Sequence, residues 1–440
     1  MQQDEGKVEE LHLEVYGNRS ILIEGDGSHV IFLEGQSSKL AQERLNRIKE
    51  ALRNGFLENR ILEIRDGKTP LLDNDTFRQL AEDLVNSLTS EVGRALIGLT
   101  ILQCCIKSIE PEQSIRLHKA SRNGTGFSWT EGISMRSIDR EMITPILRKH
   151  DLLRLNADGF MMTRSLAENY PYTKVYKAAL RGAKEEWLRI VDAIESGEMN
   201  ASVTLDFILA LLVNKSHEFQ IEARQTLRVV DEFIALSKDF DDIVEVISSF
   251  VGDRDVSYSA RIFEVAMHSL MQVLAERDGF EGFLKPLTQM RSANKKHGNI
   301  GDIEILEAPN SLLINEAWDA KFGKPHLRDE LEELSEKLVM HPETRTVGFV
   351  VDSAPDLRQD IQARAADIEQ LFNVKIFILS FPEWVNLMSE RVGADCGTLG
   401  SEWLKAFAES LCQKRRDIAP IDEPSLGWVK QLGAYLANRS

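Results

Sequence analysis

Two carboxylates and a lysine in the last third of the chain have the types and spacing of a divalent-cation site. Residues 298–323 read GNIGDIEILEAPNSLLINEAWDAKFG, with a turn at Pro309-Asn310-Ser311 between two expected strands. Asp319 and Lys321 are two apart, so in a strand both side chains lie on one face, and a hairpin can bring Asp302 beside them. Two converging carboxylates repel and favour Mg²⁺, which prefers oxygen ligands. A lysine beside such a site can orient an attacking water or stabilise developing negative charge, so the pattern indicates hydrolysis.

Alternating helices and strands surround these residues and would have to position them. Before them the chain reads SYSARIFEVAMHSLMQVLAER, an amphipathic helix. After them come, in order, a helix LRDELEELSEKLVMH, an apolar strand TVGFVVD, a helix RQDIQARAADIEQLF and an apolar strand VKIFILSF. Buried apolar strands connected through helices predict an α/β layer with a mixed sheet.

This arrangement resembles the PD-(D/E)XK nuclease superfamily, whose signature is an Asp followed by D/E-x-K across a β-hairpin. Here Asp302 and Asp319-Ala320-Lys321 match it, with the two acids 17 positions apart. The residue before Asp302 is Gly301, where the family often has Pro. The resemblance covers residues 255–390 and follows the family's order of helix, three strands, helix and strand.

The resemblance implies roles for four residues. Asp302 and Asp319 would bind Mg²⁺, Lys321 would position a water, and Glu264, in the preceding helix, would be a further catalytic residue and metal ligand. The implied reaction is hydrolysis of a phosphodiester by in-line attack of water, without a covalent enzyme intermediate.

A second pattern, ISMRSIDREMITPILRKHDLLRLNADGFMMTRSLAENY, resembles a winged helix-turn-helix. A helix would run from Ser134 or Ser137 to about His150, followed by a β-hairpin that turns at residues 156–159. Helices near 91–109 and 111–120 would complete a three-helix unit.

Basic residues of this pattern have the chemistry to contact DNA phosphates and base edges. The residues expected to bind DNA are Arg136, Arg140, Arg148 and Lys149 in the helix, Arg154 and Arg164 in the wing, and Lys295 and Lys296 before the carboxylate–lysine pattern. The alternatives are a helical subdomain with solvated arginines, or a winged helix that contacts protein. The loop SRNGTGFSWTEG is either a DNA-reading loop or a long turn around a buried aromatic residue.

Composition and charge restrict the classes of protein. The chain has 440 residues, 43% of them hydrophobic, and a net charge of −17. Residues 114–190 carry 14 Lys/Arg against 8 Asp/Glu, which is +6 and leaves −23 for the rest. This asymmetry indicates one basic module in an acidic body.

Several other classes are disfavoured by what the sequence lacks. It has no run of 18 apolar residues and no secretory signal, so we expect a cytoplasmic protein that does not span a membrane. The four cysteines form no CxxC pair, which disfavours a disulfide scaffold and a structural zinc site. No GxxxxGK[ST] loop is present, so we expect no nucleotide cofactor.

The sequence therefore predicts an α-rich, α+β multidomain protein, with a winged helix-turn-helix in its N-terminal half and a C-terminal α/β restriction-endonuclease-like mixed sheet. The expected segments are 1–90, a strand and helix region; 91–175, the winged-helix DNA-binding domain; 176–250, a helical connector; and 251–440, the nuclease domain.

The function expected is that of a Mg²⁺-dependent, sequence-specific endonuclease of double-stranded DNA, similar to type II restriction enzymes. A double-strand break by one site per chain suggests a homodimer. The alternatives are a DNA-binding regulator with an inactive nuclease-like fold, a branched-DNA or transposase-type nuclease, and a helical interaction protein in which the pattern is accidental. A separation of Asp302 from Asp319 above about 10 Å would favour the last, because the two could not share one ion.

Overall fold

The chain forms two compact units, the first ending at Glu218 and the second beginning at Phe219. Helix α8 (Ala201–Ile234) contributes to both units and is continuous through Asn214. The structure divides into two units, whereas the sequence analysis expected four segments, and the division into four stays a prediction. The computed structural model describes residues 10–89, 91–119, 127–153, 166, 170–180, 182–236, 239–253, 258–287, 299–324, 327–393, 397–415 and 425–439.

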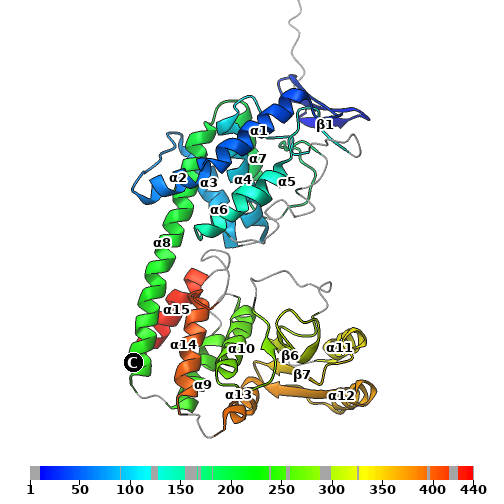
Figure 1. Ribbon diagram of the computed structural model, residues 1–440, viewed down its shortest axis with the longest axis vertical. Helices are drawn as coiled ribbons and strands as arrows, with labels where there is room; N and C mark the ends of the chain where they lie inside the picture. The colour runs from blue at the N-terminus through cyan, green and yellow to red at the C-terminus, as the bar shows by residue number, and fades with distance from the viewer. Residues whose placement is uncertain are drawn as a thin grey trace, which may run out of the picture. The chain divides into compact units, whose positions relative to one another are not determined.

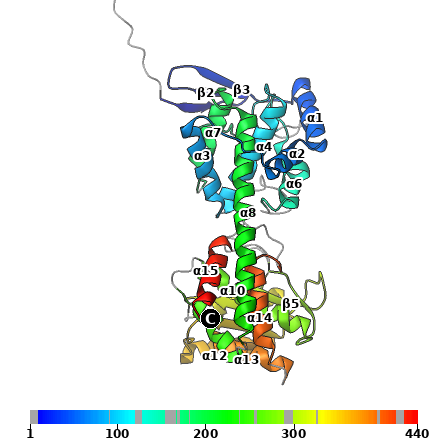
Figure 2. The same cartoon turned by 90° about the vertical axis from the view of Figure 1, so that its left-hand side faces the viewer.

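The first unit combines a small antiparallel sheet with a helical core (Figures 1 and 2). The sheet, expected from the alternating sequence, has the order β1-β2-β3, and Leu22 and Phe32 on its inner face pack on Trp129. Its strands are β1 (His12–Val15), β2 (Arg19–Ile23) and β3 (His29–Leu33). Its helices are α1 (Lys39–Arg53), α2 (Phe56–Arg65), α3 (Asp75–Asn86), η1 (Ser87–Thr89), α4 (Glu91–Ile109), α5 (Met135–Ile138), η2 (Asp139–Ile143), α6 (Thr144–Lys149) and α7 (Lys184–Glu195).

Helix α4 is the central helix of the first unit. Its segment Val92–Ile109 is long and apolar enough to cross a membrane by length and composition, but 78% of it is buried inside the protein. Helices α3 and α7 pack beside it, and Trp187 of α7 donates a hydrogen bond to Gln103 of α4 at 2.8 Å. The apolar surface of α4 is therefore covered by the other helices of the unit.

The helix expected from Ser134 or Ser137 to His150 is present, with a π-helical turn, η2, between α5 and α6. The prediction of a helix at 111–120 is wrong, because the described residues 110–119 form turns and irregular chain. Glu195 of α7 accepts a hydrogen bond from the Ile115 N–H at 2.5 Å, and Gln103 donates one to the Ile115 carbonyl at 2.9 Å. These partners replace the hydrogen bonds that a helix would make within itself.

The second unit is built on a five-stranded mixed sheet of order β4-β5-β6-β7-β8. The first three strands are antiparallel neighbours, and β6, β7 and β8 run parallel. The strands are β4 (Phe283–Leu284), β5 (Ile303–Leu306), β6 (Ile314–Lys321), β7 (Thr346–Val351) and β8 (Lys375–Ser380). The helices are α9 (Phe240–Val251), α10 (Ser259–Glu276), α11 (Arg328–Met340), α12 (Gln359–Phe372), α13 (Phe381–Ser389), η5 (Glu390–Val392), α14 (Leu399–Leu411) and α15 (Ser425–Ala437).

Helices cover both faces of this sheet, as Figure 1 shows for α10 and α11. Helices α11 and α12 pack on one face, and α10 and α13 pack on the other. Strand β7 is consequently apolar along its length, as expected for a strand buried on both faces. The chain order from α10 to β7 is helix, three strands, helix and strand, which confirms the mixed α/β layer predicted from the sequence.

Trp318 fixes the position of β6 within the sheet. Its side chain is fully buried, and its ring packs at a tilt against Phe377 and edge-on against Trp384. A Cβ at position 348 of β7 would lie 2.0 Å from the Trp318 ring, so Gly348 leaves the space that the ring fills. The residue that follows Trp318 is thereby held at a defined depth in the sheet.

Three cysteines are free and buried in the described residues: Cys104 and Cys105 in the first unit and Cys412 in the second. Burial raises the pKa of the Cys105 and Cys412 thiols to about 12, and it raises the pKa of Cys104 further. These thiols are therefore packing groups of the two cores.

Candidate active site

Asp302 and Asp319 meet where β5 begins and β6 ends. Ile303, the first residue of β5, pairs with Trp318, so the residues on either side of this pair face each other across the hairpin. The two carboxyl groups are hydrogen bonded to each other, and the Ala320 N–H donates to Asp302 Oδ2 at 3.0 Å. Asp302 and Asp319 are therefore not separated in the way that would favour a helical interaction protein with an accidental carboxylate–lysine pattern.

Burial and neighbouring negative charge make this pair difficult to ionise. Asp319 is 8% exposed, and its burial, followed by the charge of Asp302, raises its pKa well above the ordinary value. The pKa of Asp302 is also raised, first because surrounding protein atoms displace water from its carboxyl group and then because of the charge of Glu264. Part of the Asp302 side chain is still exposed to solvent. Carboxyl groups this close share a proton unless a cation replaces it.

Lys321 is held between two carboxylates. Its Nζ lies 2.9 Å from Asp319 Oδ2 and 2.6 Å from Glu330 Oε2 at the start of α11, and its side chain is 14% exposed. Burial alone would lower the pKa of Lys321, but the charge of Asp319 and the hydrogen bond to Glu330 outweigh it and raise the pKa. The ammonium is thus charged, and one of its three N–H donors is left for a further ligand.

The negative charge of Glu264 raises the pKa of Asp302, which indicates that Glu264 lies near the carboxylate pair. Its Oε2 accepts a hydrogen bond from Nη1 of the buried Arg261 at 2.6 Å. Among the described residues, no three His, Cys, Asp or Glu side chains are grouped closely enough to hold a metal ion. The role of Glu264 as a metal ligand stays a prediction.

The donor chemistry of Asp302 and Asp319 nevertheless fits Mg²⁺. This ion commonly takes one or two protein carboxylates and keeps waters or substrate phosphates in its other positions, so a cluster of three protein ligands is not required. Burial, and after it the charge of a neighbouring carboxylate, raises the pKa of Asp302 and of Asp319, and a bound cation would favour the ionised form of both groups.

Position 301, directly before Asp302, has a structural requirement for glycine. A Cβ at position 301 would lie 2.7 Å from the carbonyl oxygen of Trp318, too close for any side chain or for a proline ring. Glycine therefore lets β5 begin directly against the backbone of β6, which places Asp302 beside Asp319.

Two acids that the sequence did not single out support the site. Glu330, in the first turn of α11, fixes Lys321, and Asp352, just after β7, accepts a hydrogen bond from the Gly323 N–H at 2.7 Å. The sequence signal was weak, because an acid in the first turn of a helix also serves the helix dipole. Glu304, by contrast, is buried, forms an ion pair with Lys285 at 2.5 Å and accepts a hydrogen bond from the Ile300 N–H at 2.7 Å.

The residues expected to bind DNA are only partly described. Arg136 and Arg140 are exposed, and Arg148 is partly buried. Lys149 is exposed and forms an ion pair with Glu58 at 2.5 Å. The wing, with Arg154 and Arg164, and the pair Lys295 and Lys296 lie outside the described residues.

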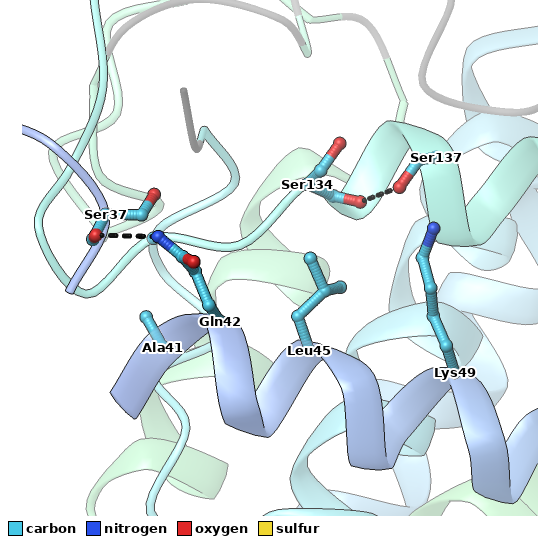
Figure 3. Close-up of a pocket in the computed structure, with 8 residues that line it drawn as sticks. Ser37, Ala41, Gln42, Leu45, Lys49, Ser134 and Ser137 are labelled. Atoms are coloured by element: carbon cyan, nitrogen blue, oxygen red, sulfur yellow. Dashed lines mark hydrogen bonds between the residues drawn. The ribbon is translucent and has the colours of Figure 1, made fainter. Parts of the chain in front are cut away.

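A pocket of about 310 Å³ separates α1 from the start of α5 (Figure 3). Ser134 and Ser137 line it from the α5 side and are joined by a hydrogen bond of 2.9 Å, while Gln42 and Lys49 line it from α1. This serine face of the helix is turned toward α1, whereas Arg136 and Arg140 are exposed to solvent.

In the described part of the loop SRNGTGFSWTEG, the structure agrees with a long turn around a buried aromatic residue. Trp129 is 1% exposed and packs edge-on against Phe127 and Phe32. Its ring is therefore part of the core beneath the small sheet.

No family model and no curated protein sequence matches this chain.

Proposed function

We propose that this protein is a Mg²⁺-dependent endonuclease of double-stranded DNA, with a restriction-endonuclease-like second unit and a winged-helix element in its first unit. The observation that carries the proposal is the contact of Asp302, Asp319 and Lys321 at one end of a mixed sheet with the chain order of the PD-(D/E)XK core. Sequence specificity and a homodimeric, cytoplasmic protein are part of the same proposal.

In this proposal, Asp302 and Asp319 hold the cation through their carboxylate oxygens. Bound Mg²⁺ supplies the positive charge that lowers the pKa of a water and neutralises charge on the departing oxygen. Asp319 is fixed by its place in β6, and Asp302 by the Ala320 N–H and the hairpin pairing. Both ligands are consequently in place before a substrate binds.

Lys321 serves as the group that orients the nucleophile. Asp319 and Glu330 use two of its N–H donors, so the third can hold a water or a phosphate oxygen in a fixed direction. Glu330 acts as a positioning residue, because it touches Lys321 and no reacting group in this scheme. The exposed Lys324, 3.4 Å from the other oxygen of Glu330, adds positive charge nearby.

The basic segment of the first unit supports DNA as the substrate. Its local charge of +6 contrasts with the acidic remainder of the chain, and Arg136 and Arg140 stand exposed on one helix. Guanidinium groups on a helix are suited to phosphates and guanine edges.

The test is incubation of the purified chain with unmethylated phage DNA, with Mg²⁺ in one arm and EDTA in the other, followed by sequencing of any ends. We expect fragments with defined ends only in the Mg²⁺ arm. Intact DNA in both arms, across several DNA sources, would argue for the inactive DNA-binding alternative. Equal cleavage in both arms would contradict the metal site.

Replacing Arg136 and Arg140 together by Ala is expected to weaken DNA binding. Removing an arginine that binds a phosphate should reduce the slope of log K against log salt by about one, and removing one that reads a base should cost roughly 1–3 kcal/mol. Fluorescence anisotropy with labelled duplex across a salt series measures both quantities. Arg53→Ala, at an exposed arginine of α1, is the control and should change neither. Unchanged affinity and slope in the double variant would place the DNA surface elsewhere.

A further inference from the structure

A second pocket, of about 600 Å³, lies at the start of α7 in the first unit, outside the candidate active site. Its size is in the range of sites for small organic molecules. It is lined by Lys174, Gly182, Lys184, Glu185, Leu188 and Arg189. Three cations and one carboxylate therefore surround it.

Two of these cations are little neutralised by the protein. Arg189 is exposed and has no acidic partner among the described residues. Lys174 is 51% exposed and lies 3.6 Å from Asp192 Oδ2, but that carboxylate also pairs through its other oxygen with the buried Arg116. One carboxylate shared by two cations leaves positive charge on the exposed one.

The third cation is fixed in direction by neutral groups. Lys184 Nζ donates to the carbonyl oxygens of Tyr176 and Ala178 at 2.6 and 2.7 Å, which orient the ammonium without cancelling its charge. Helix α7 begins here with Ala183 at its N-cap and no capping side chain. Its first N–H groups thus add positive potential at the same place.

We propose that this pocket binds a phosphate ester. The surplus of positive charge selects an anion, and the volume exceeds what an inorganic phosphate fills, so part of the ligand contacts Leu188 and the carbon chains of the lysines. A free nucleotide and a stretch of DNA backbone both present this chemistry. The site is separate from the Asp302–Asp319 pair, and it does not depend on the proposed nuclease activity.

The experiment compares the full chain with a Lys174→Gln/Arg189→Gln variant. Both side chains are exposed, so the variant should keep the thermal midpoint of the parent protein. Lys177→Gln, at a lysine outside the pocket lining that lies 5.9 Å from the centre of the Tyr170 ring, is the matched control. All measurements use EDTA, so that cleavage does not enter.

Isothermal titration calorimetry with each of the four nucleoside 5′-monophosphates forms the first arm, and anisotropy with a short duplex across a salt series forms the second. A tenfold or greater loss of nucleotide affinity in the double variant alone would identify a free nucleotide as the ligand. A loss of duplex affinity, with the salt slope reduced by about two, would identify the DNA backbone. If neither probe binds less well to the double variant than to the Lys177→Gln control, the proposal is overturned.

Discussion

Asp319→Asn is expected to stop Mg²⁺-dependent DNA cleavage while it raises the thermal stability of the metal-free protein at neutral pH. The change removes a carboxylate from the cation site, and the loss of several kcal/mol of transition-state stabilisation corresponds to roughly a thousandfold in rate. The same change removes a buried carboxyl group whose pKa is raised by its burial and then by the charge of Asp302. Single-turnover cleavage and thermal unfolding in EDTA measure the two effects.

The stability gain should depend on pH with a defined sign. A carboxyl group whose pKa is raised in the folded state binds protons more tightly when folded, so the free energy of unfolding falls as pH rises from about 4 through the raised pKa. Each unit of pKa difference contributes about 1.4 kcal/mol, and an amide cannot contribute this slope. The difference in melting temperature between Asp319→Asn and the parent should therefore grow from pH 4 to pH 8.

Mg²⁺ gives a further readout of the same variant without DNA. The parent should gain stability from added Mg²⁺, and Asp319→Asn should gain much less, because a ligand that binds only the folded state stabilises it. Asp367→Asn, at an exposed position of α12, is the control and should behave like the parent in every assay. Full cleavage by Asp319→Asn, or a flat pH dependence of the stability difference, would contradict the assignment of this site.

Lys321→Arg is expected to bind cognate DNA and to cleave it at least about a hundredfold more slowly than the parent. The Lys321 ammonium occupies one point, 2.9 Å from Asp319 and 2.6 Å from Glu330, in a side chain that is 14% exposed. A guanidinium group keeps the charge but is a broad planar fork, so it cannot place a donor at the same point. A misplacement of about 1 Å is enough to cost roughly a hundredfold when a group must align a nucleophile.

The control for this variant is Lys324→Arg, because Lys324 contacts the same Glu330 at 3.4 Å but is 64% exposed. It should cleave at close to the parent rate. Single-turnover measurements at saturating enzyme separate the chemical step from binding. A rate for Lys321→Arg within about threefold of the parent would show that charge alone suffices, or that Lys321 is not in the site.

The elements of the second unit were largely predictable because their sequence periods are strong. The apolar run of β7 and the amphipathic helices α10, α11 and α12 agree with the structure. The second strand of the hairpin was expected directly after the turn at residues 309–311, but it begins at Ile314. Ser311 Oγ accepts a hydrogen bond from the Leu313 N–H, which keeps this segment in a turn. Local side-chain bonds of this kind compete with strand pairing and are hard to foresee.

Long-range contacts explain two segments whose structure differs from what their local sequence favours. The segment after Pro111 is not helical, because Ile115 takes its hydrogen-bond partners from α4 and α7. Helix α8 continues past Asn214, although asparagine disfavours helix interiors, because Leu212 is buried in one core and Phe219 in the other. In both cases tertiary packing decides the outcome, which a local pattern does not contain.

Part of the site was accessible from sequence and part was not. The period of two along a strand placed Asp319 and Lys321 on one face, and the hairpin explained the approach of Asp302. The contribution of Glu330 depends on the chain returning after β6 so that α11 begins over Lys321. The reason for Gly301 likewise depends on its distance from the Trp318 backbone, which only the folded hairpin defines.

The buried thiols offer a way to time the opening of each unit separately. Alkylating reagents react with the thiolate, so Cys104 and Cys105 are protected while the first core is closed, and Cys412 while the second is closed. With Cys396 replaced by Ser, pulse labelling in denaturant followed by peptide mass spectrometry would assign every modified thiol to one unit. The labelling rates would then report two opening equilibria from a single chain, through thiols that are already part of its cores.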